Sequence, residues 1–223
     1  DSGGLFESID GGLRWSHVDK LPVIFTQSIA YLPNDVVLVS AKADFKTTNG
    51  GGVWRRDISG DWAQVTLTVP FPSAPLSAYE ISAVDENVVV GTSEGVFVST
   101  NSGLSWTWSG PFGGGDRRVF SVLLTSGASP RIIAGGPGGV RLGTIAPGPW
   151  VPSNSSIGGI WSIHAFGRSP LSTSQAFVTT GHLLYRTEDA GTNWIQIPSP
   201  PQGTGQCAGT PFIKAALGKG FLN

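Results

Sequence analysis

Short stretches in which apolar and polar residues alternate recur along the chain, separated by turns rich in glycine, proline and serine. They come in groups of three: SAYEISAV, for example, is followed by NVVVGTS and then by GVFVS. Alternation with a period of two and many β-branched residues predict strands. No segment with a helical period is longer than about two turns. The pattern therefore predicts an all-β protein.

The third strand of each group runs into a turn that ends at a tryptophan. GVFVSTNSGLSW is matched by GLFESIDGGLRW and HLLYRTEDAGTNW, and GVWRRDISGDW and GVRLGTIAPGPW are less similar copies. The closing tryptophans lie 47, 44, 44 and 44 residues apart, at Trp15, Trp62, Trp106, Trp150 and Trp194. A period in the forties with strand content is typical of β-propeller blades of four antiparallel strands.

The five copies predict a five-bladed β-propeller, a single domain over residues 1–223. From Trp106 to the next opening glycine, Gly139, is 33 residues, and joining the two ends of the chain gives the same interval. A ring closed by pairing N- and C-terminal strands in one blade would leave no sheet edge open. The expected blades are residues 19–70, 71–112, 113–152, 153–200, and 201–223 plus 1–18. Their inner strands are expected near 25–31, 78–83, 118–124, 160–166 and 212–217.

The second copy admits another register, because TTNGGGVW, ending at Trp54, also fits the motif. Choosing Trp54 as the closing residue would break the 44-residue spacing. We therefore interpret KADFKTTNGG as a loop inserted before a strand that begins at Gly52.

The motif Ser/Thr-x-Asp/Asn-x-Gly-x-x-Trp resembles the Asp-box, or bacterial neuraminidase repeat, of propellers such as sialidases, sortilin-type receptors and photosystem assembly factors. The matching positions are Ser8, Asp10, Gly12 and Trp15; Ser99, Asn101, Gly103 and Trp106; and Thr187, Asp189, Gly191 and Trp194. The resemblance implies a structural turn between the two outer strands of a blade, away from the ligand-binding face. The Asp or Asn side chain is expected to accept backbone N–H bonds, the glycine to adopt a positive φ, and the tryptophan to bury a large apolar area.

Composition and charge exclude several classes of function. Only 13% of the residues are charged, and no apolar run approaches the 18 residues of a membrane-spanning helix. Fourteen basic and fifteen acidic residues give a net charge of −1, which disfavours a nucleic-acid partner. The three histidines, His17, His164 and His182, lack metal-ligand spacing, and we expect no metal and no cofactor.

Several features favour a secreted, extracellular protein. The chain has no methionine, starts at Asp1, and carries a glycosylation sequon at Asn154. Cys207 is its only cysteine, so no disulfide forms within the chain. Cys207 is either a buried free thiol, which we favour, or a link to another chain.

The groups that catalysis would require do not converge in the predicted fold. Sialidases, whose motif this chain resembles, need three arginines around a carboxylate, whereas most arginines here lie in or beside the outer hairpins. Glycoside hydrolysis needs two placed carboxyl groups, and Glu80 is the only acid on a predicted inner strand. We therefore predict that the protein is not an enzyme. Among the functions considered, glycoside hydrolysis is the least favoured.

The loops between blades differ from one another while the scaffold positions repeat, which favours one asymmetric binding face. Near the start of the inner strands, equivalent positions hold Tyr79, Phe120, Trp161 and Phe212, with Gln27 in the fifth. These rings either pack between blades or form a platform for a ligand; Trp108 is a second candidate. The residues expected to contact a partner are Tyr79, Glu80, Phe120, Trp161 and His164. We predict a secreted interaction module, an accessory subunit that docks one macromolecule; the alternative is a lectin with one or two sites.

Overall fold

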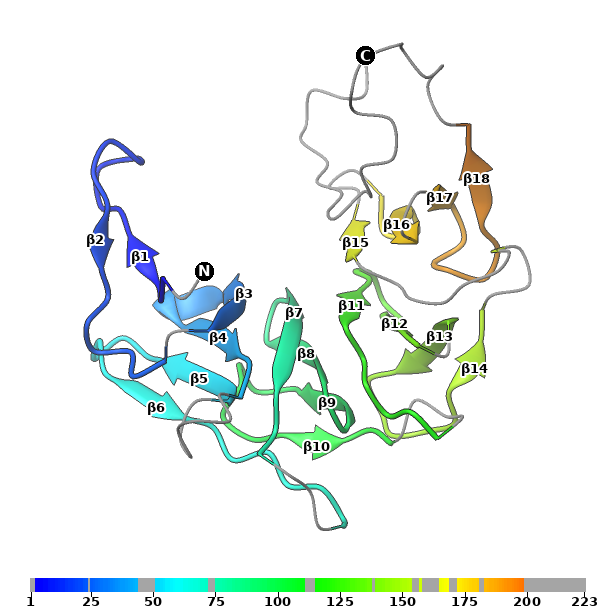
Figure 1. Ribbon diagram of the computed structural model, residues 1–223. Helices are drawn as coiled ribbons and strands as arrows, with labels where there is room; N and C mark the ends of the chain where they lie inside the picture. The colour runs from blue at the N-terminus through cyan, green and yellow to red at the C-terminus, as the bar shows by residue number, and fades with distance from the viewer. Residues whose placement is uncertain are drawn as a thin grey trace.

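The fold is all-β. The computed structural model describes residues 3–23, 25–43, 51–71, 75–110, 115–137, 139–153, 157, 165–168, 172–180 and 183–198. Within these ranges the strands form four antiparallel sheets of four strands and one of two strands, and the only helix is a 3-10 turn at Pro33–Asp35. Figure 1 shows the sheets following one another around an arc, the arrangement of a β-propeller.

Each four-stranded sheet is built from four consecutive strands, and we number these blades in chain order. Blade 1 holds β3 (Thr26–Tyr31), β4 (Val37–Ala41), β5 (Gly52–Arg56) and β6 (Trp62–Gln64). Blade 2 holds β7 (Ala78–Val84), β8 (Asn87–Thr92), β9 (Gly95–Ser99) and β10 (Thr107–Trp108). Blade 3 holds β11 (Ser121–Leu124), β12 (Arg131–Gly136), β13 (Gly139–Thr144) and β14 (Val151–Pro152). Blade 4 holds β15 (Ala165–Arg168), β16 (Ala176–Thr180), β17 (Leu183–Thr187) and β18 (Ile195–Ile197).

The first strand of each blade lies on the inside of the arc. β3 contacts β7, β7 contacts β11, and β11 contacts β15, while the fourth strands lie on the outside (Figure 1). The predicted inner strands at 25–31 and 78–83 are confirmed. β11 begins later than expected, because Val119 donates its N–H to Thr92 of blade 2 instead of pairing within blade 3. The predicted strand at 160–166 is described only from residue 165, and that at 212–217 lies outside the described residues.

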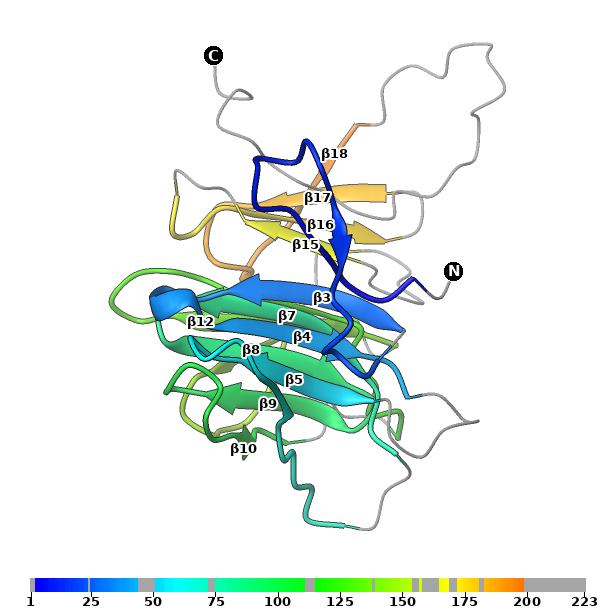
Figure 2. The same ribbon diagram turned by 90° about the vertical axis from the view of Figure 1, so that its left-hand side faces the viewer.

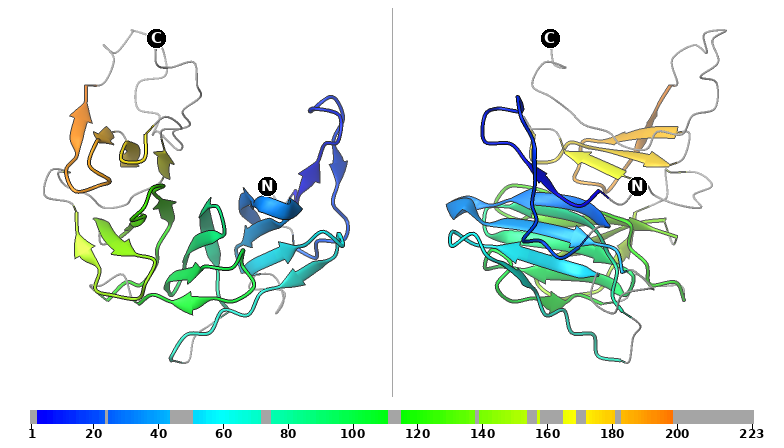
Figure 3. Two further views of the ribbon diagram at one scale, coloured as in Figure 1. Left: turned by 180° about the vertical axis from the view of Figure 1, so that it is seen from behind. Right: turned by 60° about the vertical axis from the view of Figure 1, so that its left-hand side comes forward.

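The fifth sheet is the N-terminal hairpin, in which β1 (Phe6–Glu7) pairs with β2 (Ser16–His17). It packs on blade 1 through Leu5 and Val18, and Thr26 Oγ1 donates a 3.0 Å bond to the Gly4 carbonyl. Figure 2 shows this hairpin in front of blade 1, and Figure 3 shows it at one end of the arc with blade 4 at the other. The remaining strands of this blade, expected from residues 201–223, lie outside the described residues, so the predicted blade boundaries stay a proposal.

The hydrophobic core lies mostly between blades. One cluster joins Leu38 of blade 1 to Val90 and Phe97 of blade 2, and the next joins Val98 of blade 2 to Ile132 of blade 3. Apolar side chains of blades 3 and 4 make a third cluster. Because successive strand residues point to opposite faces, blades 2 and 3 each bury apolar side chains against the blade on either side.

The strand beginning at Gly52 confirms the register chosen for the second copy. Trp54 lies inside β5, where it pairs with Val39 on one side and Gln64 on the other. Its side chain is only 8% exposed. Trp54 is therefore a core residue of a strand, and Trp62 is the residue that closes the turn.

Candidate functional site

Three turns between third and fourth strands share one set of hydrogen bonds. In blade 2, Asn101 Oδ1 accepts bonds of 2.9 Å from Ser99 Oγ and from the Ser105 N–H, and Gly103 N–H donates to Ser99 Oγ at 3.0 Å. The same bonds centre on Asp10 in the N-terminal hairpin and on Asp189 in blade 4. The polar atoms of the motif are therefore satisfied within the turn.

In blades 2 and 4 the motif glycine has a second role, because it lets the turn pack against the preceding blade. Gly103 and Gly191 have φ values of +78° and +87°. A Cβ on Gly103 would lie 2.9 Å from Leu38 of blade 1, and one on Gly191 would lie 2.9 Å from Leu142 of blade 3. These turns are therefore joints between blades.

The tryptophans that close the three turns differ in burial. Trp194 is 3% exposed and donates to Ser153 Oγ at 3.2 Å, whereas Trp15 is 63% exposed. The expectation that every motif tryptophan buries a large apolar area is thus wrong for Trp15. The reason is that a Cβ on Gly12 would meet only the Trp15 ring, so no described blade packs against this turn.

At the opposite end of the sheets, where the inner strands begin, two expected residues meet. Tyr79 and Phe120 lie edge to face with ring centroids 5.2 Å apart. The Arg118 guanidinium lies 5.4 Å from the Phe120 centroid and forms a bidentate pair with Asp116, at 2.6 Å for its shortest contact. Both rings are half-buried, so they neither lie in the core nor stand free.

A second cluster of the same kind adjoins the first. The Arg117 guanidinium lies 4.0 Å from the centroid of Phe71 and 3.3 Å from the Glu94 carboxylate. Phe71 is edge-on to Trp108 at 5.6 Å, and Trp108 Nε1 donates to the Glu94 carbonyl at 2.9 Å. The charges of Arg118 and Asp116 in the first cluster and of Glu94 in the second all act on the Tyr79 phenol, so the two clusters are neighbours on blades 2 and 3. We call them together the aromatic–arginine face: Phe71, Tyr79, Glu94, Trp108, Asp116, Arg117, Arg118 and Phe120.

Charges on this face are locally paired. The bonds from Arg118 hold the pKa of the Asp116 carboxyl below its usual range, against the opposing effect of burial. Burial raises the pKa of the Tyr79 phenol. The face therefore presents two fixed ion pairs and a neutral phenol at neutral pH.

Glu80, also expected on the binding face, joins two blades. Its Oε2 accepts a bond of 3.1 Å from the Val122 N–H and a further bond from the Ser121 hydroxyl. Val122 is 1% exposed, so its N–H depends on this carboxylate. Glu80 thus holds β7 against β11.

Trp161, His164, Asn154, Phe212 and Cys207 lie outside the described residues, and their expected roles stay predictions. Gln27 is exposed on β3, so blade 1 has no ring at the position of Tyr79 and Phe120. Sequence reasoning missed five residues of this face as binding candidates: Phe71, Glu94, Asp116, Arg117 and Arg118. The signal for Phe71 was an aromatic residue in a proline-rich connection, PFPSAPLS.

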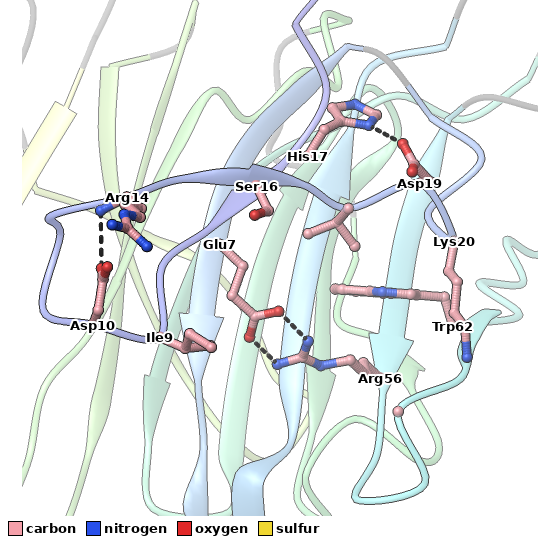
Figure 4. Close-up of a pocket in the computed structure, with 12 residues that line it drawn as sticks. Glu7, Ile9, Asp10, Arg14, Ser16, His17, Asp19, Lys20, Arg56 and Trp62 are labelled. Atoms are coloured by element: carbon pink, nitrogen blue, oxygen red, sulfur yellow. Dashed lines mark hydrogen bonds and ion pairs between the residues drawn. The ribbon is translucent and has the colours of Figure 1, made fainter.

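A groove of about 820 Å³ lies between the N-terminal hairpin and blade 1 (Figure 4). Across it, Arg56 donates two bonds of 3.0 Å to the Glu7 carboxylate, which lower the pKa of Glu7 below its usual range. Arg56 also lies 5.6 Å from the centroid of the Trp62 ring. Sequence reasoning did not predict this groove.

Two kinds of site are absent from the part of the chain that the structure describes. There, no three His, Cys, Asp or Glu side chains gather closely enough to hold a metal ion. The described residues also contain no helix that is long and apolar enough to cross a membrane.

No protein-family description and no curated protein matches the sequence. Solved structures match the fold. An extracellular domain assigned to a hybrid two-component system of B. thetaiotaomicron has a TM-score of 0.66 at 14% identity, over 88% of this chain and 26% of that one. YCF48 bound to D1 peptide gives 0.55 at 12% identity, over 77% and 54%. A GH74 enzyme from Niastella koreensis gives 0.53 at 18% identity, over 76% and 29%.

These likenesses show the fold, and the chain is a β-propeller. It spans less than two thirds of the length of each of these three proteins. They include an enzyme, an extracellular domain and a peptide-bound protein, so the fold by itself does not select a function.

Proposed function

We propose that this chain is an extracellular, non-catalytic interaction module that docks one protein partner through the aromatic–arginine face. The observation that carries the proposal is the pair of arginines, Arg117 and Arg118, each held over an aromatic ring by its own carboxylate. Arginine, tyrosine and tryptophan are the residues that most often dominate binding energy at protein interfaces. Side chains ordered before binding lose less conformational entropy when a partner arrives.

The charge of the face favours a protein of mixed polarity. Arg117 and Arg118 are balanced by Glu94 and Asp116, which leaves no net charge to attract a polyanion. The half-buried rings supply apolar contact area beside the paired charges. This combination matches the apolar centre and polar rim of protein–protein interfaces.

The position of the face favours a single partner site. Blades 2 and 3 supply its residues, whereas the equivalent position of blade 1 is Gln27. A module with one site per blade would repeat its binding residues. The residues that repeat are those of the turns in the N-terminal hairpin and in blades 2 and 4, and we propose that these turns are Asp-boxes with a structural role.

Two similar proteins support parts of this proposal. YCF48 is a propeller in complex with a peptide, and the B. thetaiotaomicron domain is extracellular. We propose by analogy that this chain is secreted, glycosylated at Asn154, and an accessory subunit of another secreted protein. Trp161 and His164 extend the face, and Cys207 stays a free thiol.

Native mass spectrometry of the protein purified from its source tests the proposal. We expect a stoichiometric complex with another polypeptide. Arg118→Ala and Phe120→Ala should each weaken it by about tenfold or more, the loss of one hot-spot contact. Leu104→Ala is the matched control, because Leu104 is 66% exposed in a turn at the opposite end of blade 2. A lone monomer, or a complex equally sensitive to all three changes, would contradict the proposal.

A further inference from the structure

The groove between the N-terminal hairpin and blade 1 exists because the turn of blade 1 departs from the repeat. When Gly52 is aligned with Gly95, Arg56 and Ile58 stand at the Ser/Thr and Asn/Asp positions, and the interval from Gly52 to Trp62 is one residue shorter than that from Gly95 to Trp106. The turn of blade 1 is closed instead by Asp57, whose carboxylate accepts the Ser59 N–H at 2.9 Å. This change in sequence alters how blade 1 meets its neighbour.

In blade 2 the turn between β9 and β10 packs against blade 1. Gly103 packs on Leu38, and Arg55 Nε donates to the Ser102 carbonyl at 3.0 Å. In blade 1 the corresponding glycine, Gly60, has no atom of the described residues within 4 Å of the place where its Cβ would lie. Among these residues Gly60 therefore makes no contact like that of Gly103 with Leu38, and it lines the groove instead.

Half of the residues that line the groove are charged, and their charges balance. Three carboxylates and three cationic groups line it: Glu7, Asp10, Asp19, Arg14, Lys20 and Arg56. Figure 4 shows the Glu7–Arg56 pair between the two walls, with Asp10 and Arg14 at one side and Lys20 and Trp62 at the other. A ligand with a large net charge of either sign would gain little from such a lining.

The paired side chains keep hydrogen-bonding capacity toward a ligand. Each oxygen of the Glu7 carboxylate accepts one bond from Arg56, and a carboxylate oxygen has lone pairs for a second. Each Nη of a guanidinium carries two hydrogens, so Arg56 has donors beyond the two that Glu7 uses. The Glu7–Arg56 pair thus offers a ligand an acceptor beside a donor.

We infer that this groove is a binding site for a neutral oligosaccharide, independent of the aromatic–arginine face. Hydroxyl groups both donate and accept, so neighbouring hydroxyls of a sugar match an ion pair that offers an acceptor beside a donor. A volume of about 820 Å³ falls within the range of roughly 300–1,000 Å³ typical of small-molecule sites. The ligand class is therefore an uncharged, hydroxyl-rich chain of sugars.

A peptide fits the groove less well. The strands nearest to it, β2 and β6, are two and three residues long, which is too short to template an added strand. A helix would need an apolar stripe, whereas charged side chains dominate the lining.

Saturation-transfer NMR with the purified chain and a panel of neutral glucan, mannan and chitin oligomers tests the inference, with acidic and basic peptides as competing probes. Ser16→Trp places a large ring in the groove from an exposed position on β2. Thr107→Trp is the matched control, because Thr107 is exposed and also directly follows a motif tryptophan, but lies in blade 2. Circular dichroism and thermal melting verify that both variants fold.

We expect at least one oligosaccharide to bind, with affinity about tenfold or more weaker in Ser16→Trp and unchanged in Thr107→Trp. Asp19→Asn, an isosteric change at an exposed carboxylate of the groove, should weaken binding without affecting folding. The inference is overturned if no oligosaccharide of the panel binds, or if Ser16→Trp and Thr107→Trp behave alike. It is also overturned if only a peptide binds and Ser16→Trp blocks it. None of these results depends on the aromatic–arginine face.

Discussion

Glu7 on β1 and Arg56 on β5 form two parallel hydrogen bonds of 3.0 Å between the N-terminal hairpin and blade 1. The planar guanidinium matches both oxygens of the carboxylate, so the pair fixes the orientation of the hairpin. The Glu7 side chain is 45% exposed and that of Arg56 is 19% exposed, so solvent screens the attraction in part. Its main effect is therefore to hold the N-terminal hairpin and blade 1, which form the two walls of the groove, in a fixed position relative to each other.

This pair predicts a weak dependence of stability on pH. Arg56 lowers the pKa of Glu7 in the folded state, so the stabilisation is complete above the unfolded value of about 4.3 and is lost as the pH falls through the lower folded value. A double-mutant cycle of Glu7→Gln and Arg56→Gln should give a coupling free energy of about 1 kcal/mol or less at neutral pH. The coupling should vanish in acid. A coupling that grows on acidification would refute this prediction.

Asn101→Ala should lower the free energy of unfolding by about 1–2 kcal/mol, because the Ser105 N–H and the Ser99 hydroxyl lose their acceptor. Urea denaturation measures the change. Partner binding by the folded variant should match the wild type, because this turn lies away from the aromatic–arginine face. A variant with native stability and lost binding would assign the turn a direct functional role.

Gly103 and Gly60 provide a matched pair of substitutions. Both have a positive φ, +78° and +83°, so alanine is strained at either position. Only at Gly103 does the new Cβ meet another blade, at 2.9 Å from Leu38. Gly103→Ala should therefore destabilise the protein by about 1–3 kcal/mol more than Gly60→Ala, the usual effect of overpacking. Equal effects in denaturant titrations would disprove the proposed joint between blades 1 and 2.

Glu80→Ala should cost about 1–3 kcal/mol of stability, because it leaves the buried Val122 N–H without its carboxylate acceptor. Glu80→Gln keeps an acceptor oxygen and should cost less. Assays on sialosides, arabinans and xyloglucan should show no turnover by the wild type. A glycosidase activity abolished by Glu80→Gln would show that Glu80 acts in catalysis.

The strands were predictable because their signals are local. The apolar and β-branched residues of SAYEISAV and NVVVGTS predict strands by themselves, and the 44-residue spacing of the closing tryptophans excluded Trp54 in favour of Trp62. The contacts that make the two candidate sites were not predictable in this way. Arg117 lies over Phe71, and Glu7 pairs with Arg56, across blades whose relative positions no short pattern encodes. The shortened turn around Gly60 is visible in the sequence, but the groove also depends on where the N-terminal hairpin lies, which that turn does not reveal.

The location of the apolar clusters between neighbouring blades has a consequence for how the molecule unfolds. Each sheet depends on contact with the next, so cooperativity should pass from neighbour to neighbour, as in linear repeat proteins. β8 of blade 2 and β12 of blade 3 contribute to clusters shared with adjacent blades, whereas among the described residues the N-terminal hairpin contributes to the one it shares with blade 1. Amide hydrogens of β8 and β12 should therefore exchange only on global unfolding, while those of β1 and β2 exchange more readily. Within the described part of the chain, the groove would then lie at an interface that opens more easily than those of blade 2 with blades 1 and 3, so a bound ligand should add protection from exchange there.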